Sequence, residues 1–419
     1  PQIYNFRYNI FSSEWPVANR VIELYLQKKS ENGGWERQIN GISNNEKAVL
    51  LLEKRTFKEL LVDMELRNLQ NNIVGQEASR LFARAEINMG VEAFRDSLYS
   101  LLKRNTFLNI KFENMLDTLG EISRTDIRSL LGEWEKTTSL PFYSLGEPTL
   151  TKITNKGGEE FFVLKMLISN NSDYDGIIHM DIRKDGWWYQ PLEDPRAKTK
   201  IEMPAHTSKE FVSVWEDQIR NVEINTMVSG NLPNIISQDI NNVKQERNKI
   251  VKDSIYILPE SSFDLPGEII VDNEDSTLFI LSAPPIVGLL PKWLDEVEET
   301  PFKYSGISWW RPPLQWTATT NDRYYGKYIR SAFVIKSGDG SQTATWKVPV
   351  PEVGQYDLYY HVFKDDELRW NNNLQGEYHF KVKYGSEVED AYVNLRKANE
   401  GWEQLGSYYF DSDTIRVVL

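Results

Sequence analysis

The sequence has 419 residues, with 61 acidic against 48 basic side chains and a formal net charge of -13. This charge argues against nucleic acid and anionic membrane surfaces as partners, because both favour clustered Lys and Arg. A hydrophobic content of 40% with 12% aromatic residues excludes a disordered chain, and the length leaves room for roughly three domains.

The sequence contains no cysteine, which excludes disulfides, thiolate nucleophiles and cysteine-ligated zinc. No run approaches the ~20 apolar residues that a membrane-spanning helix needs. The sequence begins at Pro1 without a Met or the basic and apolar regions of a signal peptide. We therefore expect a processed or excised portion of a longer protein, and any membrane anchor would lie outside this chain.

The first third of the sequence has the periodicity of amphipathic helices. Residues 46–70 predict one long helix, with Leu60 and Met64 on its apolar side. Four shorter helices follow between residues 75 and 143, and Gly90 stands where the first of them should end. Short helices joined by short polar links must pack on one another, so we expect a helical bundle.

From Leu140 onward the period changes to the alternation of β-strands. The strand-like segments are 150–154, 160–169, 177–183, 208–215 and 222–228. They predict a small antiparallel β-sandwich. The polar segment 241–252 has little apolar content and predicts a helical or loose linker.

Four separated motifs lie in the strand-rich C-terminal part. They are Tyr-Tyr-Gly-x-Tyr-x-Arg-Ser-Ala at 324–332, Thr-Ala-Thr-Trp at 343–346, Pro-x-x-Gly-x-Tyr-x-Leu-Tyr at 351–359 and Gly-Trp-x-x-Leu-Gly-x-Tyr-Tyr-Phe at 401–410. This set resembles the golvesin and xanthan-lyase type of carbohydrate-binding-like β-sandwich. The Val271-Asp272-Asn273 turn resembles the opening of that family, which implies an insertion at about 276–321. The family normally continues into one more strand after Leu419, so we expect that strand to be absent or disordered here.

The helical part carries a second resemblance. It contains Met89-Gly90, Asn109-Ile-Lys-Phe112, Glu133-Trp134 and Leu140-Pro141-Phe-Tyr143 in that order. This order resembles the C-terminal part of the catalytic domain in zinc aminopeptidases of the aminopeptidase N type, the gluzincins, over about residues 4–143. The resemblance implies a wall beside a substrate cleft. In that family the His-Glu-x-x-His zinc helix lies N-terminal to this block.

The zinc chemistry of the gluzincins cannot be built from this sequence. Its histidines are His179, His206, His361 and His379. None is followed by Glu, and no two are three or four residues apart, so no helix aims two imidazoles at one ion. The family's oxyanion-stabilising Tyr would fall near Val74, where the sequence has none. We predict no catalytic residue on this chain, and zinc only in a longer parent protein.

Two groups of residues are candidates for binding. The aromatic group is Trp309, Trp310, Trp316, Tyr324 and Tyr325, in loops rich in Pro and Asn. Such rings stack on sugars when exposed, although packing between domains is the alternative.

The second group is the acidic turn Asp272, Asn273, Glu274 and Asp275. Clustered oxygen ligands of this kind bind Ca²⁺ in β-sandwich modules. The alternative is that Asp and Asn simply favour the geometry of the turn.

The sequence therefore predicts an α+β multidomain protein, with an N-terminal α-helical bundle followed by two antiparallel β-sandwiches. The predicted domains are 1–143, 144–250 and 251–419, the last with the insertion. We expect a non-catalytic binding or scaffold portion of a larger protein, located outside the cytoplasm, in the periplasm or at the cell surface. By analogy with aminopeptidase-like domains fused to ABC-type permeases, it would be tethered through a membrane-associated parent chain.

Two alternatives stay open. The chain could be the C-terminal half of a zinc aminopeptidase whose metal-binding half lies outside it, or a dedicated glycan-binding module. The expected partners are the rest of the parent chain or a membrane complex, with polysaccharide or peptide as ligands and no nucleic acid.

Overall fold

The computed structural model describes residues 8–27, 34–154, 157–184, 190–247, 251–259, 267–282, 302–307, 312–364, 376–411 and 413–419. The chain divides into two compact units. Unit 1 is Pro1–Glu36 with Ser43–Phe263, and unit 2 is Arg37–Ile42 with Asp264–Leu419. Each unit has its own hydrophobic cores. Among the described residues, no helix is long and apolar enough to cross a membrane.

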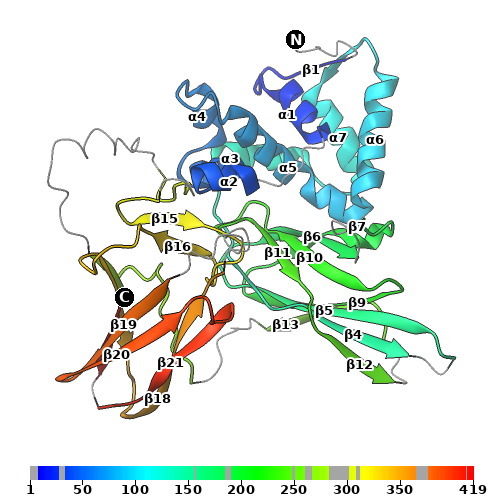
Figure 1. The fold of residues 1–419 in the computed structure, drawn as a ribbon. Helices are drawn as coiled ribbons and strands as arrows, with labels where there is room; N and C mark the ends of the chain where they lie inside the picture. Colours follow the sequence, from blue (N-terminus) through cyan, green and yellow to red (C-terminus); the bar gives the residue numbers. More distant parts are fainter. Residues whose placement is uncertain are drawn as a thin grey trace. The chain divides into compact units, whose positions relative to one another are not determined.

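Helices make up the first part of unit 1 (Figure 1). They are α1 (Ala18–Leu26), α3 (Asn44–Lys54), α4 (Phe57–Val62), α5 (Gln70–Met89), α6 (Val91–Arg104), α7 (Phe112–Ser123) and the 3-10 helix η1 (Arg128–Glu135), while α2 (Gly34–Asn40) runs across the boundary between the units. Two short parallel strands, β1 (Asn9–Phe11) and β2 (Asn109–Lys111), lie beside them. The predicted α-helical part with strands following it is confirmed.

Helix α5 is the centre of this helical part, since α1, α3, α4, α6, α7 and η1 all contact it. Its buried face includes Phe82, whose ring lies 4.7 Å from that of Tyr25 and 5.5 Å from that of Phe94. Helix α5 ends at Gly90, whose φ of +86° is a conformation that favours glycine. The predicted end of this helix is therefore confirmed.

The prediction of one long helix over 46–70 is wrong. The structure breaks it between α3 and α4 at Thr56, which caps α4. The Thr56 hydroxyl accepts a hydrogen bond from the Glu59 backbone N at 3.2 Å, and the Glu59 carboxylate accepts one from the Thr56 backbone N at 2.9 Å. This reciprocal capping box stabilises a new helix start. Met64, predicted to be apolar-facing, is 65% exposed.

Two sheets follow in the same unit (Figure 1). The first contains β6 (Gly176–Lys184), β7 (Gln190–Pro191), β8 (Lys198–Met203), β10 (Ile219–Asn225) and β11 (Ile235–Asp239). The second contains β3 (Tyr143–Leu145), β4 (Thr149–Thr154), β5 (Glu160–Asn170), β9 (Thr207–Trp215), β12 (Val243–Arg247) and β13 (Ser254–Pro259). Side chains from both sheets form one buried cluster, which is the core of the predicted sandwich.

The predicted linker over 241–252 is wrong, because its first half forms strand β12. This strand pairs in parallel with β4, from Val243 opposite Leu150 to Arg247 opposite Thr154. Strand β12 lies at the edge of its sheet, where polar and charged side chains are common. Its low apolar content therefore reflects an edge position rather than a lack of structure.

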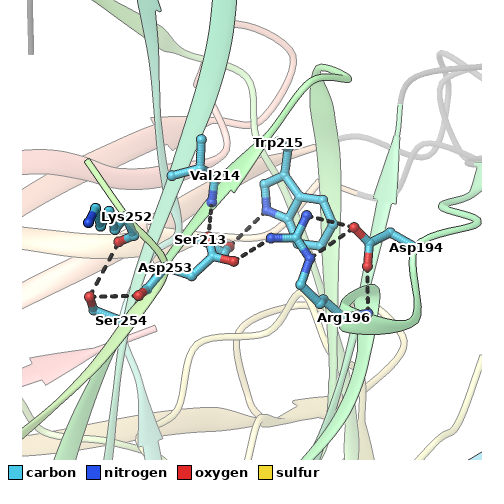
Figure 2. A network of polar contacts seen from close by, with 8 residues as sticks. All are labelled: Asp194, Arg196, Ser213, Val214, Trp215, Lys252, Asp253 and Ser254. Carbon is cyan, nitrogen blue, oxygen red and sulfur yellow. Dashed lines mark hydrogen bonds and ion pairs between the residues drawn. The ribbon is translucent and has the colours of Figure 1, made fainter. Parts of the chain in front are cut away.

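A network around Arg196 fastens the segment before β13 to strand β9 (Figure 2). The Arg196 guanidinium lies 4.9 Å from the Trp215 ring and pairs with Asp194 at 2.6 Å and with Asp253. Asp253 also accepts a hydrogen bond from the Val214 backbone N at 2.7 Å. The network holds the outermost strand of the second sheet in register.

Two buried glutamates join the helical part to the first sandwich. The Glu86 carboxylate, on α5, pairs with the ammonium group of Lys200 on β8 and accepts a hydrogen bond from the Tyr25 hydroxyl at 2.8 Å. The Glu46 carboxylate, on α3, accepts from the backbone N of Ser43 at 2.6 Å and of Asn234 at 2.8 Å. Both glutamates are almost completely buried. The helices and the sandwich are therefore one folded body.

Unit 2 is a second sandwich. One sheet has the order β14 (Phe279–Ser282), β17 (Thr343–Pro349), β22 (Thr414–Val418), β19 (Glu377–Tyr384) and β20 (Glu387–Asn394). The second sheet consists of β18 (Gly354–Val362) and β21 (Gly401–Phe410), which pair with each other. Strands β15 (Thr317–Thr320) and β16 (Ser331–Val334) form a separate two-stranded sheet. Phe380 and Phe410 lie in the core between the sheets. The Thr320 hydroxyl donates to the carbonyl of Gly41 at 2.6 Å, which holds residues 37–42 in this unit.

The predicted division into three domains stays a prediction. Each unit contains one β-sandwich, and unit 1 contains the helices as well.

The Glu86 joint gives the first testable prediction. Replacing Glu86 by Leu leaves the Lys200 ammonium buried without its carboxylate and removes the acceptor of Tyr25. We expect the unfolding free energy of unit 1 to fall by about 3–5 kcal/mol, the usual cost of breaking a buried ion pair. Denaturant unfolding followed by circular dichroism measures it.

The matched control for this prediction is the double variant Glu86→Leu with Lys200→Met. It removes both charges, so we expect it to recover most of the lost stability. A Glu86→Leu single variant as stable as the wild type would contradict the assigned role of the joint.

His179 gives a pH prediction for the same joint. It lies on β6 opposite Lys200, and burial, followed by the nearby Lys200 charge, lowers its pKa from 6.5 to about 4. The unfolded chain therefore binds a proton in this window before the folded chain does. We expect the stability of unit 1 to fall as the pH drops from about 6.5 to about 4.

Denaturant unfolding at pH values on both sides of this window measures the effect, with His179→Gln as the control. The Gln variant has no titrating group at this position, so its stability should depend less on pH. Identical pH profiles for the two proteins would show that His179 does not contribute.

Candidate functional site

The two-stranded sheet of unit 2 separates its side chains cleanly between two faces. Strands β18 and β21 pair antiparallel from Gly354 opposite Phe410 to Val362 opposite Gly401, with one irregularity after Leu358. Because side chains alternate along a strand, every second residue points into the sandwich. Tyr356, Leu358, Tyr360, Val362, Tyr408 and Phe410 do so and pack in the core.

The opposite face of this sheet carries exposed aromatic side chains. Tyr359 is 47% exposed, Trp402 is 50% exposed and Tyr409 is 65% exposed. We call these three residues with Tyr325 and His361 the aromatic face. Large aromatic side chains at such exposures leave a substantial apolar area in contact with water.

One end of the aromatic face is a cluster of three rings. The Trp402 ring centre lies 4.9 Å from that of Tyr325 and 5.2 Å from that of His361, and the Tyr325 and His361 rings are 5.2 Å apart. His361 is directly opposite Trp402 in the register of the two strands. Burial lowers the pKa of His361, which favours the neutral ring at neutral pH. The cluster therefore presents uncharged rings.

The loop that supplies Tyr325 is anchored by its neighbour Arg323. The guanidinium of Arg323 makes two hydrogen bonds to Glu400, at 2.6 and 3.3 Å, and a third to the carbonyl of Lys364 at 2.8 Å. The same guanidinium lies 5.3 Å from the Phe363 ring. These contacts tie the loop to the ends of β18 and β21, so Tyr325 is held beside Trp402.

Polar groups lie next to these rings in the middle of the same face. The Asp357 carboxylate accepts hydrogen bonds from the Ser407 hydroxyl and from the Gln404 amide, the latter at 3.3 Å. Gln404 also donates to the Ser407 hydroxyl at 3.2 Å. All three side chains are exposed. They offer donors and acceptors to a polar ligand lying along the strands.

Exposed rings beside hydrogen-bonding side chains on a flat sheet suit a ligand that has both apolar faces and hydroxyl groups. This combination is typical of carbohydrate-binding-like β-sandwich modules. Residues 312–419 match the family model of the Golvesin C-terminal domain. The predicted golvesin resemblance is therefore confirmed for residues 312–419, whereas the predicted opening turn at 271–273 and the insertion at about 276–321 stay predictions.

The other comparisons add little. No curated protein matches the sequence. A solved structure of Bacteroides uniformis beta-glucuronidase 2 covalently bound to cyclophellitol-6-carboxylate aziridine is similar at 10% identity and a TM-score of 0.15. The match covers 78% of this chain and 36% of that chain. It carries no argument about fold or function. The family match and the structural match named here give no evidence for a gluzincin domain.

The predicted aromatic residues are scattered rather than gathered. Tyr325 lies in the ring cluster, whereas Tyr324 packs on Phe363 with ring centres 4.7 Å apart. Trp316 is half-buried, and its indole nitrogen donates to the carbonyl of Ser282 on β14 at 3.2 Å. Trp309 and Trp310 lie outside the described residues. Ligand binding by these predicted residues stays a prediction.

The sequence analysis did not single out Tyr359, His361, Trp402 or Tyr409. The sequence could have identified Tyr409, because side chains alternate along a strand and its neighbours Tyr408 and Phe410 point into the core. Strict alternation would place Trp402 on the same inner face as Tyr408, however, because the two residues are an even number of positions apart. The irregularity in the β18 and β21 pairing reverses the alternation between them, which places Trp402 on the outer face.

The acidic turn is engaged with side chains of its own unit. The Glu274 carboxylate pairs with the Lys303 ammonium at 2.5 Å and accepts hydrogen bonds from the hydroxyl groups of Tyr304, at 3.2 Å, and Ser331. The Asp275 carboxylate accepts from the backbone N of Asp272 at 2.8 Å. These contacts support the reading of the segment as a structural turn.

Three further observations bear on the predicted calcium site. Burial raises the pKa of Asp272 to about 6, so this carboxylate is less readily ionised than an exposed one. The side-chain amide of Asn273 lies 2.6 Å from the Ser331 hydroxyl. Within the described ranges, no three His, Cys, Asp or Glu side chains are grouped so that they could hold a metal ion. Calcium binding here stays a prediction.

Unit 1 contains a cavity of about 550 Å³ between α5, η1 and the first sheet. Its wall includes Glu77, Arg80, Arg84, Glu133, Trp134 and Glu202. Arg80 lies 3.5 Å from the buried Glu77 carboxylate, and Arg84 lies 3.5 Å from that of Glu202. Each arginine therefore has a carboxylate partner in the wall of the cavity itself.

The acidic turn gives a testable prediction for unit 2. Replacing Glu274 by Gln removes the charge that compensates Lys303 and weakens the acceptor for Tyr304 and Ser331. We expect the unfolding free energy of unit 2 to fall by about 1–3 kcal/mol. Thermal and denaturant unfolding measure it, with the exposed Glu268→Gln as the control.

The same proteins test the calcium prediction. A ligand that binds only the folded state raises the unfolding midpoint with its concentration. A rise with Ca²⁺ in the wild type that is lost in Glu274→Gln would support a calcium site, and an unchanged midpoint in the wild type would refute it.

Proposed function

We propose that unit 2 binds a carbohydrate through the aromatic face of β18 and β21. The observation that carries this proposal is the half-exposed Trp402 ring, held against Tyr325 and His361 and followed along the strands by polar side chains. Sugar rings have apolar faces that stack on aromatic rings, and hydroxyl groups that hydrogen-bond to side chains such as Gln404. The family match of residues 312–419 supports the same class of ligand.

The length of the aromatic face favours a polymeric carbohydrate over a single sugar. Trp402 stands at one end of β21 and Tyr409 near the other. At roughly 3.3 Å per residue, they are separated by about 20 Å along the strand. Tyr359 and Gln404, paired across the strands, lie between them. A chain of several sugar units would contact both ends, whereas a monosaccharide would contact only one.

The proposal includes a role as a binding or scaffold portion of a larger protein located outside the cytoplasm. A polysaccharide ligand supports this location, because such polymers lie on cell surfaces. Tethering through a membrane-associated parent chain belongs to the same proposal and rests on analogy alone.

The gluzincin relationship of about residues 4–143 also remains a proposal. It is supported by the order of its sequence motifs and by the succession of helices in unit 1. The sequence has no His-Glu-x-x-His motif, so the zinc aminopeptidase alternative depends on residues that this chain does not contain. A peptidase activity of the parent protein is therefore the weaker of the two functional proposals.

Carbohydrate binding is tested by Trp402→Ala. Removing the half-exposed ring deletes the stacking surface, and we expect affinity for a bound polysaccharide to fall by about tenfold or more, equivalent to ~1.4 kcal/mol. A glycan array identifies the ligand, and affinity electrophoresis or calorimetry measures the change. Because the ring is 50% exposed, the variant should fold as the wild type does.

The matched control is Tyr392→Ala on β20. Tyr392 is 57% exposed and stacks on His379, but it belongs to the other sheet of the sandwich. Trp316→Ala tests the residue predicted from the sequence. Loss of binding in Tyr392→Ala or Trp316→Ala, with Trp402→Ala unchanged, would place the site elsewhere. A wild type that binds no polysaccharide would refute the proposal.

A further inference from the structure

The loop between α6 and β2 exposes its apolar side chains to water. Phe107 is 82% exposed and Leu108 is 56% exposed. Phe11, 46% exposed, lies on β1, which pairs Phe11 with Lys111 of β2 and donates a backbone hydrogen bond from Asn9 to the carbonyl of Leu108 at 3.3 Å. The loop lies at the end of the helical part that is remote from the two sheets of unit 1 (Figure 1).

The loop is held in this form by its own polar groups. The Asn105 side chain donates to the carbonyl of Leu101 at 2.8 Å, and the Thr106 hydroxyl donates to that of Lys103 at 2.6 Å. The Leu108 backbone N donates to the carbonyl of Asn105 at 3.0 Å. The polar groups are thus bound within the loop, while the apolar groups face outward.

Phe107 adopts a backbone conformation that is unfavourable for its side chain. Its φ is +65°, in the left-handed region that bulky residues rarely occupy. Glycine or asparagine would adopt this conformation more easily. Phe107 is both strained and exposed, so its side chain does not stabilise the fold. A contact between this side chain and something outside the folded unit is the physical reason for a phenylalanine at this position.

Basic side chains surround these apolar groups. Lys103 and Arg104 end α6, Lys111 follows on β2, and all three are exposed. In the part of the chain that the structure describes, Lys103 and Arg104 form no ion pair, and Lys111 interacts electrostatically with Glu113. The nearest acid in the sequence, Glu113, is buried and accepts a hydrogen bond from the Ser12 hydroxyl at 2.5 Å. The loop is therefore locally cationic.

We propose that this patch, made of Phe11, Phe107 and Leu108 with Lys103, Arg104 and Lys111, docks unit 1 onto a membrane surface that contains anionic lipid. Phe and Leu side chains enter the boundary between head groups and acyl chains, while Lys and Arg bind lipid phosphates. The combination of both kinds of side chain on one projecting loop is what selects a lipid surface over a sugar or a purely apolar partner.

The net charge of -13 does not oppose this docking. At physiological ionic strength, charges are screened beyond about 8 Å, so the charges nearest the lipid dominate. The acidic residues that produce the net charge are spread along the sequence. The cationic patch would therefore set the orientation of the protein on the membrane.

Flotation of the full chain with lipid vesicles tests the proposal. We expect the wild type to bind vesicles of phosphatidylcholine with phosphatidylglycerol, less so at high salt, and to bind pure phosphatidylcholine much more weakly. The variant Phe107→Asn with Leu108→Ser should lose about tenfold in binding, since two inserted side chains are removed. Asparagine suits the positive φ, so the loop should keep its shape.

Val62→Ser with Met64→Ser is the matched control, because these side chains are 77% and 65% exposed in the same unit but lie beside Asp63 and Glu65. It should bind as the wild type does. Lys103→Ala with Arg104→Ala should weaken binding to the anionic vesicles only. The proposal is overturned by a wild type that binds neither vesicle, by equal binding to both, or by equal loss in the control variant.

Discussion

The buried carboxylate of Glu86 is the interaction on which the arrangement of unit 1 depends. It accepts from Tyr25 on α1 and pairs with Lys200 on β8, so three elements far apart in sequence meet at one charged group. A carboxylate this deeply buried is costly unless it is fully paired, so only one relative placement of helices and sheet satisfies it. Glu46 provides a second fixed point, because its capping role at α3 is combined with a hydrogen bond from the Asn234 backbone. Polar pairing rather than apolar packing thus fixes how the helices sit on the first sheet.

In unit 2, apolar packing takes the part that buried polar pairs have in unit 1. The core of unit 2 is crowded with aromatic rings, such as Phe380 and Phe410. Among the described residues of this unit, no ion pair is as deeply buried as that of Glu86 with Lys200. Aromatic residues that are surplus to this core lie outside, where Trp402 and Tyr409 stand half-exposed. Water contact with such rings is unfavourable. The exposed Trp402 and Tyr409 are explained if the outer face contacts a ligand, whereas folding alone does not explain them.

Periodicity in the sequence was sufficient for the type of most elements, since strands β4, β5, β6, β9 and β10 and the helices from α5 to α7 follow it. It failed where one local contact overrides the pattern. Thr56 interrupts an apolar stripe that continues across it, because its capping box with Glu59 outweighs the extension of one helix. Strand β12 was missed because an edge strand needs few apolar residues, and Trp402 was missed because a single pairing irregularity inverts the alternation. Tyr325 was found because it is an aromatic residue in a loop of the kind that exposes such rings, but its partners could be identified only once the register was known.

The net charge of the chain was also a misleading guide to its partners. The acidic total argued against any anionic surface, yet a surface interacts mainly with the charges that lie within about one screening length of it. The end of α6 illustrates this point, because Lys103 and Arg104 complement the negative end of the helix dipole and at the same time make the adjoining loop cationic. Helix stability alone explains the choice of these two residues but not the exposed Phe107 next to them. That combination requires a second reason, and a boundary between water and lipid is the environment in which a cationic helix end and an outward-facing phenylalanine are favourable together.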